Sequence, residues 1–245
     1  MTTMWAGVRE RVLALRAAPG ARRVFGAFFK GHGHGFELSP PLTGGEVAEI
    51  ETALGTSLPG EYRGFLLEVG AGGAGPDYGL FPPVLPPEES RAAFAGRLRR
   101  PFRPDHAQRA LDEYDEREPS RDAYPDEEGY RRAFGAWDDE LDEALVAGTL
   151  RVGDRGCGYH TLLVVTGPER GTVWEDVRAV GMGVVPLGGG DGGRMMFADW
   201  YLEWLSHAEH RAAEEPQGAA GEERQGAAGV EPESAAGAGE DAATP

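Results

Sequence analysis

Three side chains near the end of the last amphipathic segment could bind a metal ion. Glu203, His207 and His210 stand at i, i+4 and i+7, so a helix would place them on one face. Carboxylate and imidazole are zinc ligands, but a structural zinc site normally takes four of them. Histidines near a helix C-terminus are also favoured by the helix dipole. We therefore expect no metal here, nor at His32 and His34, where no third ligand is evident.

A cysteine and a histidine could form a thiol nucleophile with its base. Cys157 and His160 are close in sequence, but catalysis requires the fold to arrange both groups in space. The run Gly-Cys-Gly is more typical of a tight turn between two strands. The chain has no G-x-S-x-G motif and only six serines. Because no nucleophile, base and orienting group can be named together, we expect a protein that is not an enzyme.

Two glycine runs, at 70–75 and 188–193, have the G-x-G-x-x-G spacing of a dinucleotide site. The first follows a predicted helix instead of a strand. The second follows a strand, but no second strand comes after it to complete a βαβ unit. Lys30 is the only lysine and no G-K-[ST] sequence exists, which excludes a P-loop. We expect no bound cofactor.

The net charge of −17 is distributed unevenly. Residues 105–143 carry 15 acidic and 5 basic side chains, a net charge of −10, whereas residues 1–104 have a net charge of +2. Such a chain should repel nucleic acid and anionic membranes and attract a basic partner. Nothing in the sequence positions two of these carboxylates against an apolar pocket as a catalytic pair. The residues that we expect to form a surface for a basic partner are Asp112, Glu113, Asp115, Glu116, Asp138 and Asp139.

The number of cysteines and the hydropathy of the chain indicate the cellular compartment in which the protein is expected. Cys157 is the only cysteine, so no internal disulfide can form and a reducing compartment is the default. Arginines at 9, 11 and 16 interrupt any signal-peptide pattern, and no run approaches about 20 apolar residues. These features predict a cytoplasmic protein.

The first hundred residues read as helices joined by loops. An amphipathic helix is predicted at the start, with apolar residues at Trp5, Val8, Val12 and Leu15. The arginines at 9, 11 and 16 are expected on its solvent-exposed side. A glycine and histidine loop at 31–35 precedes an extended piece at 36–38. A short helix is expected at 88–99.

Two helices are signalled in succession between residues 43 and 70. Thr43 and Glu46 fit a capping box, which satisfies orphan backbone donors at a helix start. Val47, Ile50 and Leu54 then recur on one helical face. Pro59 begins a second helix, whose apolar stripe is Tyr62, Phe65, Leu66 and Val69, and Gly70 fits a left-handed C-cap.

The second half changes period. Four short β-rich runs, at 149–152, 161–166, 172–176 and 184–187, are joined by turns too short for parallel crossovers, so they predict an antiparallel meander. A helix carrying Phe197, Tyr201, Trp204 and Leu205 closes the domain.

The resulting fold class is α+β, a single domain with an antiparallel sheet of about four to six strands packed against helices. Two helices of the first half and the closing helix should cover one face of the sheet. We expect an N-terminal helix and loop at 1–35 and a domain at 36–210, interrupted at 105–143 by an acidic insertion that is helical or partly ordered and lies over the core. An acidic Ala/Gly/Glu tail at 211–245 should be disordered, because it has little apolar surface to bury.

Parts of the sequence resemble a known superfamily. The first is LTGGEVAEIETALGTSLPGEYRGFLLEVGAGGAGPDYGLFPP, and the second contains LRVGDRGCG, LLVVTGPERGTVWED, VVPL and FADWYLEWL in that order. Both resemble the SUKH superfamily, the Smi/Knr-like family of fungal cell-wall regulators and bacterial immunity proteins. The resemblance covers roughly 36–104 and 144–206. The residues that carry it, as structural or partner-facing positions, are Leu58, Pro59, Tyr62, Phe65, Leu66, Gly72, Gly73, Asp154, Gly156, Gly158, Gly171 and Trp174, with Leu163 and Val173 beside them.

This resemblance implies an α+β fold without catalysis that serves as a protein-binding module. Bacterial members are associated with the neutralisation of toxins, often nucleases, by direct binding. Together with the localised acid, it favours an immunity protein that covers a basic toxin domain. The alternative is a regulatory or scaffold module that binds a cellular partner unrelated to toxins.

Overall fold

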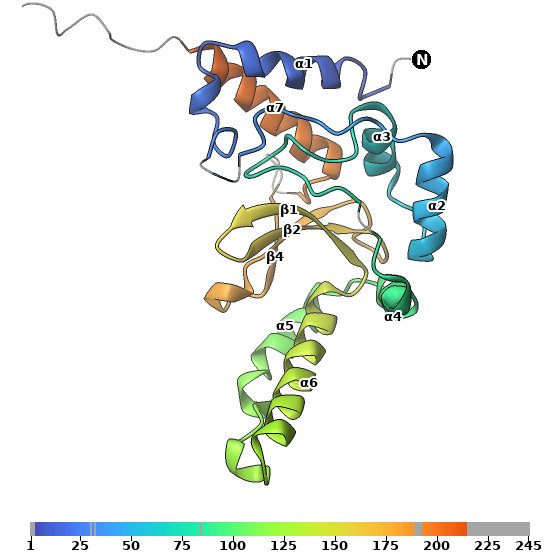
Figure 1. The fold of residues 1–245 in the computed structure, drawn as a ribbon, viewed down its shortest axis with the longest axis vertical. Coiled ribbons are helices and arrows are strands. Elements are labelled where there is room, and N and C mark those ends of the chain that lie inside the picture. The colour runs from blue at the N-terminus through green and yellow to red at the C-terminus, as the bar shows by residue number, and fades with distance from the viewer. Residues whose placement is uncertain (1–2, 30, 32, 84, 189–192, 215–245) are drawn as a thin grey trace, which may run out of the picture. The chain divides into compact units, whose positions relative to one another are not determined.

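The computed structural model describes residues 3–29, 31, 33–83, 85–188 and 193–214. Helices and one sheet make up this part of the chain, so the α+β class is confirmed (Figure 1). The helices are α1 (Val8–Ala14), α2 (Gly44–Leu54), α3 (Gly60–Glu68), α4 (Glu88–Arg99), α5 (Pro104–Asp112), α6 (Glu127–Val146) and α7 (Phe197–Ala213). Single 3-10 turns lie at Leu15–Ala17, Ala21–Arg23, Asp115–Arg117, Arg121–Ala123 and Arg178–Val180.

The sheet has the predicted meander topology. Strands β1 (Thr149–Gly156), β2 (Tyr159–Val164), β3 (Val173–Asp176) and β4 (Val184–Pro186) pair antiparallel in the order β1-β2-β3-β4. β1 is longer than predicted and runs to Gly156, because the turn that follows needs only two residues. Cys157 and Gly158 both have positive φ, 54° and 81°, as a type I′ hairpin turn requires.

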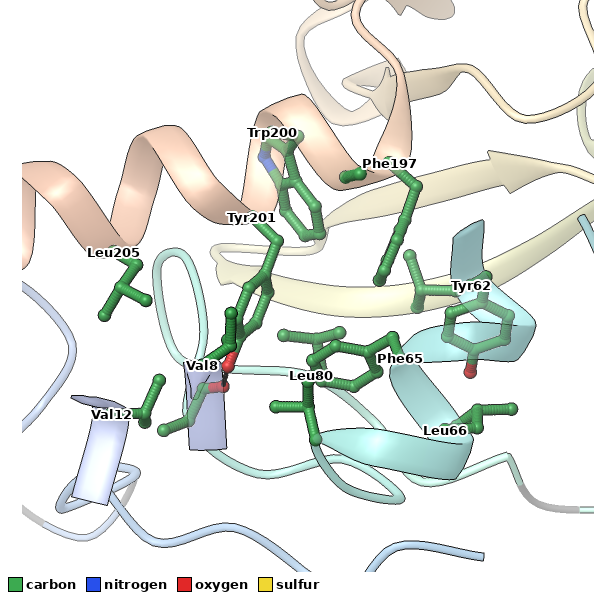
Figure 2. Packing of buried hydrophobic residues seen from close by; sticks show 14 of the residues in the cluster. Val8, Val12, Tyr62, Phe65, Leu66, Leu80, Phe197, Trp200, Tyr201 and Leu205 are labelled. Atoms are coloured by element: carbon green, nitrogen blue, oxygen red, sulfur yellow. Dashed lines mark hydrogen bonds between the residues drawn. The ribbon is translucent and has the colours of Figure 1, made fainter. Parts of the chain in front are cut away.

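A large core covers one face of the sheet. Val152, Leu163 and Val173 of the sheet are buried in it together with side chains of α1, α3 and α7. Figure 2 shows members from these helices, among them Val8, Phe65 and Tyr201. Its centre is a set of edge-to-face rings, in which Tyr201 lies 4.7 Å from Phe65 and 6.0 Å from Trp5 between ring centroids. α2 packs against α3 and α4, and both α1 and α2 bury side chains in this core.

A second, smaller core covers the opposite face. Leu162, Val164 and Trp174 point to this side and pack against Leu141 and Leu145 of α6. The remaining buried members are Phe102, Ala107 and Val146. The acidic insertion is helical, as predicted, and its base seals this face while its far end extends away from the sheet (Figure 1).

The predicted start of α2 is confirmed. Thr43 Oγ1 accepts from the Glu46 amide at 3.2 Å, and Glu46 Oε2 accepts from the Thr43 amide at 2.8 Å, which completes the capping box. The hydrogen bond from the Thr43 backbone, followed by that from its hydroxyl, holds the pKa of Glu46 below its usual value. The α4 bounds also match the prediction.

Several local expectations were wrong. Gly70 does not have a positive φ; it is required because a Cβ there would lie 2.6 Å from the Ser39 carbonyl oxygen. Arg9 is not on a wet side, since its Nη1 donates to the carbonyls of Ser39 and Val69 at 2.9 and 2.5 Å. Phe36 has φ 58° and is buried in a turn, so the extended piece expected at 36–38 is reduced to an antiparallel bridge between Leu38 and Gly73.

The boundary predicted for the tail is also displaced. α7 continues through residues 211–213, and Ala212 is buried against the large core. The predicted disorder concerns mostly residues 215–245, which lie outside the described residues.

Candidate protein-binding surface

The acidic residues singled out from the sequence lie on the α5–α6 hairpin. Asp112, Glu113, Glu116, Asp138 and Asp139 are all exposed, and none of these five forms an ion pair with a cation in the described part of the chain. Neighbouring carboxylates differ in this respect. Asp105 pairs with Arg109, and Glu140 with Arg117. The side chain of Asp115 lies outside what the structure describes. The five carboxylates therefore lack a direct ion pair in the described chain, although Glu113 is close enough to Arg117 to raise the pKa of that guanidinium, after the larger effects of Glu140.

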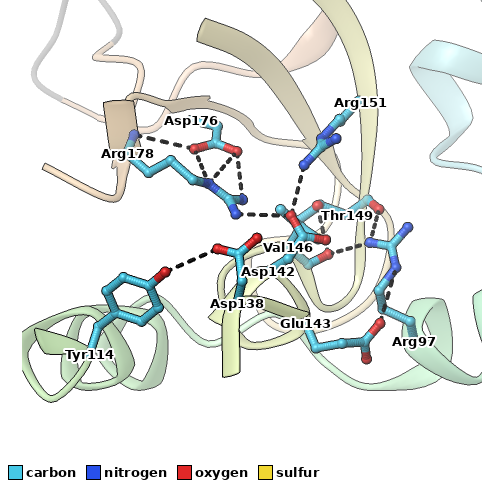
Figure 3. A network of polar contacts seen from close by, with 10 residues as sticks. All are labelled: Arg97, Tyr114, Asp138, Asp142, Glu143, Val146, Thr149, Arg151, Asp176 and Arg178. Atoms are coloured by element: carbon cyan, nitrogen blue, oxygen red, sulfur yellow. Dashed lines mark hydrogen bonds and ion pairs between the residues drawn. The ribbon is translucent and has the colours of Figure 1, made fainter. Parts of the chain in front are cut away.

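Two of these carboxylates accept hydrogen bonds from side chains of the hairpin. The Tyr114 hydroxyl donates to Asp138 Oδ1 at 3.0 Å, which joins the end of α5 to the middle of α6 (Figure 3). Gln108 Nε2 donates to Asp112 Oδ1 at 2.8 Å. The Tyr114 hydrogen bond therefore brings Asp138 of α6 beside the end of α5, twenty-four positions away in sequence.

An aromatic row runs along the same hairpin; it comprises Tyr114, Trp137, Phe134, Tyr130 and Tyr124. Consecutive ring centroids are 3.7, 4.9, 5.9 and 6.2 Å apart in that order. The first pair is stacked, with an interplanar angle of 10°, and Trp137 Nε1 donates to the Tyr114 carbonyl. Phe134 is 37 % exposed and the other four rings are half-buried.

This row offers ring faces and edges to a partner at little entropic cost, because stacking already fixes the rings. One guanidinium of the chain itself uses it: Arg121 lies over the Tyr130 ring at 5.8 Å. Aromatic rings attract cations through their negative faces. Rings bordered by free carboxylates therefore suit a surface rich in arginine and lysine.

The base of the hairpin is held by an ion-pair network and does not contribute to this surface. Asp142 Oδ1 accepts from Arg151 Nη2 at 2.8 Å and from Arg178 Nη1 at 2.9 Å (Figure 3). Arg178 in turn bonds Asp176, a carboxylate that is only 1 % exposed. A desolvated carboxylate needs such a partner, so this network fixes the hairpin to the sheet.

The residues that carry the family resemblance are mainly structural. Leu58, Tyr62, Phe65 and Leu66 are buried in the large core and Trp174 in the small one, and Pro59 is buried at the N-cap of α3. Asp154 Oδ1 accepts from the Gly156 amide within the β1 end. Positive φ values, or backbone and ring contacts that leave no room for a Cβ, explain the glycines Gly72, Gly73, Gly156, Gly158 and Gly171.

The catalytic and metal alternatives gain no support from the described geometry. Cys157 is exposed at the hairpin turn, and no hydrogen bond joins it to His160 in this part of the chain. No three His, Cys, Asp or Glu side chains gather as metal ligands among the residues described. The Nε2 of His210, one of the three residues considered as metal ligands, lies 3.8 Å from Glu214 Oε1. Both His32 and Gly190, the central glycine of the second run, lie outside the described residues.

Sequence reasoning missed a second group of exposed rings. Phe25 is 62 % and Phe29 53 % exposed, and both contact Tyr78, at 5.5 and 5.4 Å between ring centroids. The run FGAFF at 25–29 was the available signal, because it places three phenylalanines within five residues.

Comparison with known proteins adds no identification. No protein-family model, curated protein or solved structure matches this chain. None of the helices described has the length and hydropathy needed to cross a membrane.

Proposed function

We propose that this chain is a non-enzymatic protein-binding module that engages a basic protein through its α5–α6 hairpin. The partner that we propose is a toxin of the nuclease type, which makes the chain an immunity protein of the SUKH kind acting in the cytoplasm. Neutralisation then follows from direct binding, without a chemical step.

The observation that carries this proposal is the aromatic row bordered by the five unpaired carboxylates. Tyrosine and tryptophan supply most of the binding energy at many protein interfaces, inside a polar rim. Unpaired charge at that rim accelerates encounter with an oppositely charged surface and disfavours wrong partners. Tyr114 of the row also packs against the small core, whereas the unpaired carboxylates are not needed to attach the hairpin, which the small core and the Asp142 network hold.

The toxin class rests on charge and on the family resemblance. A nuclease that grips the phosphate backbone presents a basic surface to its substrate. A protein surface with free carboxylates and ring faces competes for that basic surface, which would block the substrate directly. The same features would repel nucleic acid from the hairpin itself.

Co-expression with a basic nuclease toxin encoded beside this gene tests the proposal. Full-length protein should restore growth and form a complex whose association rate falls steeply with added salt. Replacing Asp112 and Asp138 by Asn, and Glu113 and Glu116 by Gln, should slow association by about one to two orders of magnitude. Phe134→Ser should instead accelerate dissociation, because it removes a packed ring without changing the charge.

A matched control separates a specific surface from overall charge. Glu10, Glu49, Glu88 and Glu89 are exposed carboxylates outside the hairpin and without an ion pair in the described chain. Changing these four to Gln removes the same total charge. If both variants lose association rate equally, or if neither complex nor rescue is found with the native chain, the proposal is wrong.

A further inference from the structure

A groove of about 650 Å³ lies beside the sheet, away from the outer end of the hairpin. It is bounded by α2, α4, the chain after Phe81, the first half of β1 and the last turns of α6. Cavities of about 300–1,000 Å³ are typical of sites for small organic ligands. The volume is therefore that of a ligand site, not of a packing defect.

The wall of the groove is mainly apolar. Six of its side chains are Ile50, Leu54, Phe81, Leu85, Phe94 and Leu150. Of these, Leu54 is buried and Phe81 is 37 % exposed, so the wall grades from the large core to the surface. An apolar body of a ligand would gain about 25 cal/mol for each Å² that it buries here.

One end of the groove is positively charged. Among the described residues that line the groove, two arginines, Arg97 and Arg151, face one carboxylate, Asp142 (Figure 3). Burial first, and then the charges of Arg151 and Arg100, lower the pKa of Arg97, while Asp142 opposes them. An additional anion would relieve this imbalance.

Hydrogen-bonding groups of the lining are also left unused. The Arg97 guanidinium lies over the Phe94 ring at 4.7 Å and uses Nη1 for the carbonyls of Val146 and Thr149, whereas Nη2 makes no hydrogen bond in the described chain. Arg151 uses only Nη2, toward Asp142. Among the other lining residues, His160 has a buried Nδ1 without a partner. Buried polar groups normally find a partner, so the His160 Nδ1 invites one, while the remaining donors of exposed Arg151 are accessible to a ligand.

We propose that this groove binds a small amphiphilic carboxylate, with its apolar chain along Ile50, Phe94 and Leu85 and its carboxylate against Arg97 and Arg151. Guanidinium groups suit this head because their paired N–H donors match the two oxygens of a carboxylate. The inference is independent of the proposed toxin partner, since the groove and the aromatic row share no residue.

Calorimetric titration of the full-length protein with decanoate, 1-decanol and decylammonium below their micelle concentrations tests this assignment. Decanoate should bind with 1:1 stoichiometry and about tenfold more tightly than decanol, and decylammonium should bind most weakly. Arg151→Gln should reduce the affinity for decanoate to that for decanol and leave decanol binding unchanged. Arg151 is exposed, so this change should not unfold the chain.

Two further variants complete the design. Ile50→Asp should weaken decanoate and decanol alike by about tenfold or more, because it places a charge on the apolar wall. Arg131→Gln, on the exposed hairpin, should change neither affinity. Thermal unfolding of each variant checks that it is folded. Equal binding of decanoate and decanol, no binding of decanoate, or an unchanged affinity in Arg151→Gln would each overturn the proposal.

Discussion

Leu162 and Leu163 are neighbours in β2, yet their side chains enter two different cores. The core beneath Leu163 joins α1, α3 and α7 around a cluster of fully buried rings. The core beneath Leu162 is a small one that holds the base of the α5–α6 hairpin. Both residues are completely buried, so the difference lies in what each side supports.

The comparison separates stability from recognition. The large core contains Tyr201, Phe65 and Phe197 in mutual ring contact. The hairpin exposes its rings and concentrates acid, so repulsion works against it. Regions with few buried contacts open most readily, and binding surfaces are often drawn from them. We infer that one face of the sheet stabilises the fold so that the other can present a charged, aromatic surface.

Truncation of one aromatic ring on each side of the sheet should give the largest difference in stability. Tyr201→Ala removes a fully buried ring and should lower the free energy of unfolding by about 4 kcal/mol. Trp137→Ala removes a half-buried ring of the hairpin and should cost about 1–2 kcal/mol. Urea denaturation at neutral pH measures both.

A control separates ring packing from polarity. The Tyr201 hydroxyl donates to the Ala74 carbonyl at 2.8 Å. Tyr201→Phe should therefore cost only about 1–2 kcal/mol, from the loss of this bond. Equal losses for Tyr201→Ala and Trp137→Ala would refute the contrast between the two sides.

Shortening the neighbouring leucines asks whether the two cores unfold together. Leu162→Ala and Leu163→Ala should each cost about 3 kcal/mol, since both delete a fully buried side chain. Hydrogen exchange should distinguish them. Leu162→Ala should raise exchange selectively in α5 and α6, whereas Leu163→Ala should raise it in α3, α7 and the sheet. Identical exchange patterns would mean that the two cores form one cooperative unit.

Much of this architecture could be predicted because it depends on local patterns. The Thr43–Glu46 capping box, the stripe of α3 and the four turn-bounded strands each have a short-range signature. Two features could not be predicted from short-range patterns, because they depend on residues distant in the sequence. Gly70 fits a C-cap by spacing, but its backbone conformation is decided by the approach of Ser39, thirty-one positions earlier. The position of Arg9 in the helix predicts solvent exposure, but the fold brings the carbonyls of two other segments within hydrogen-bonding distance of its guanidinium.

The candidate surface was predicted only in part. Charge can be counted along the chain, which located the acidic residues. Whether a carboxylate is paired depends on where the arginines fold, and the sequence does not show that Glu140 is paired and Asp139 is not. Ring contacts between Tyr114 and Trp137, twenty-three positions apart, likewise depend on the hairpin.

Acid should weaken the large core through His34. This side chain packs against Phe36 and Trp204, and burial lowers its pKa from 6.5 to about 4. The folded state therefore keeps His34 neutral while the unfolded state takes up a proton below pH 6.5. Stability should fall by about 2 kcal/mol as the pH drops from 6.5 to about 4, with no further loss from this group below that.

Urea midpoints measured between pH 7 and 4.5 test this expectation. His34→Gln should flatten the pH dependence in this window, because it removes the proton uptake while keeping a polar side chain. The pKa of Glu46 and Glu209 is lowered, by hydrogen bonds from Thr43 and Arg11 respectively, so their contribution is lost at lower pH. An unchanged slope in His34→Gln would assign the pH dependence to other groups.

Glycine replacement inside helices should give the smallest effect, with opposite signs on the two sides. Gly135 lies in the interior of α6, exposed, and a Cβ added there would meet no atom within 4 Å. Gly135→Ala should raise the free energy of unfolding by about 0.5–1 kcal/mol through helix propensity. In α3, a Cβ at Gly64 would lie 2.9 Å from Trp5 Cδ1, so Gly64→Ala should cost about 1–2 kcal/mol by overpacking. Thermal unfolding measures both changes in stability. Stabilisation at both sites would mean that the large core accommodates an added methyl group as readily as the hairpin does. Stabilisation at Gly135 alone would show that the tight packing lies on the Leu163 side of the sheet.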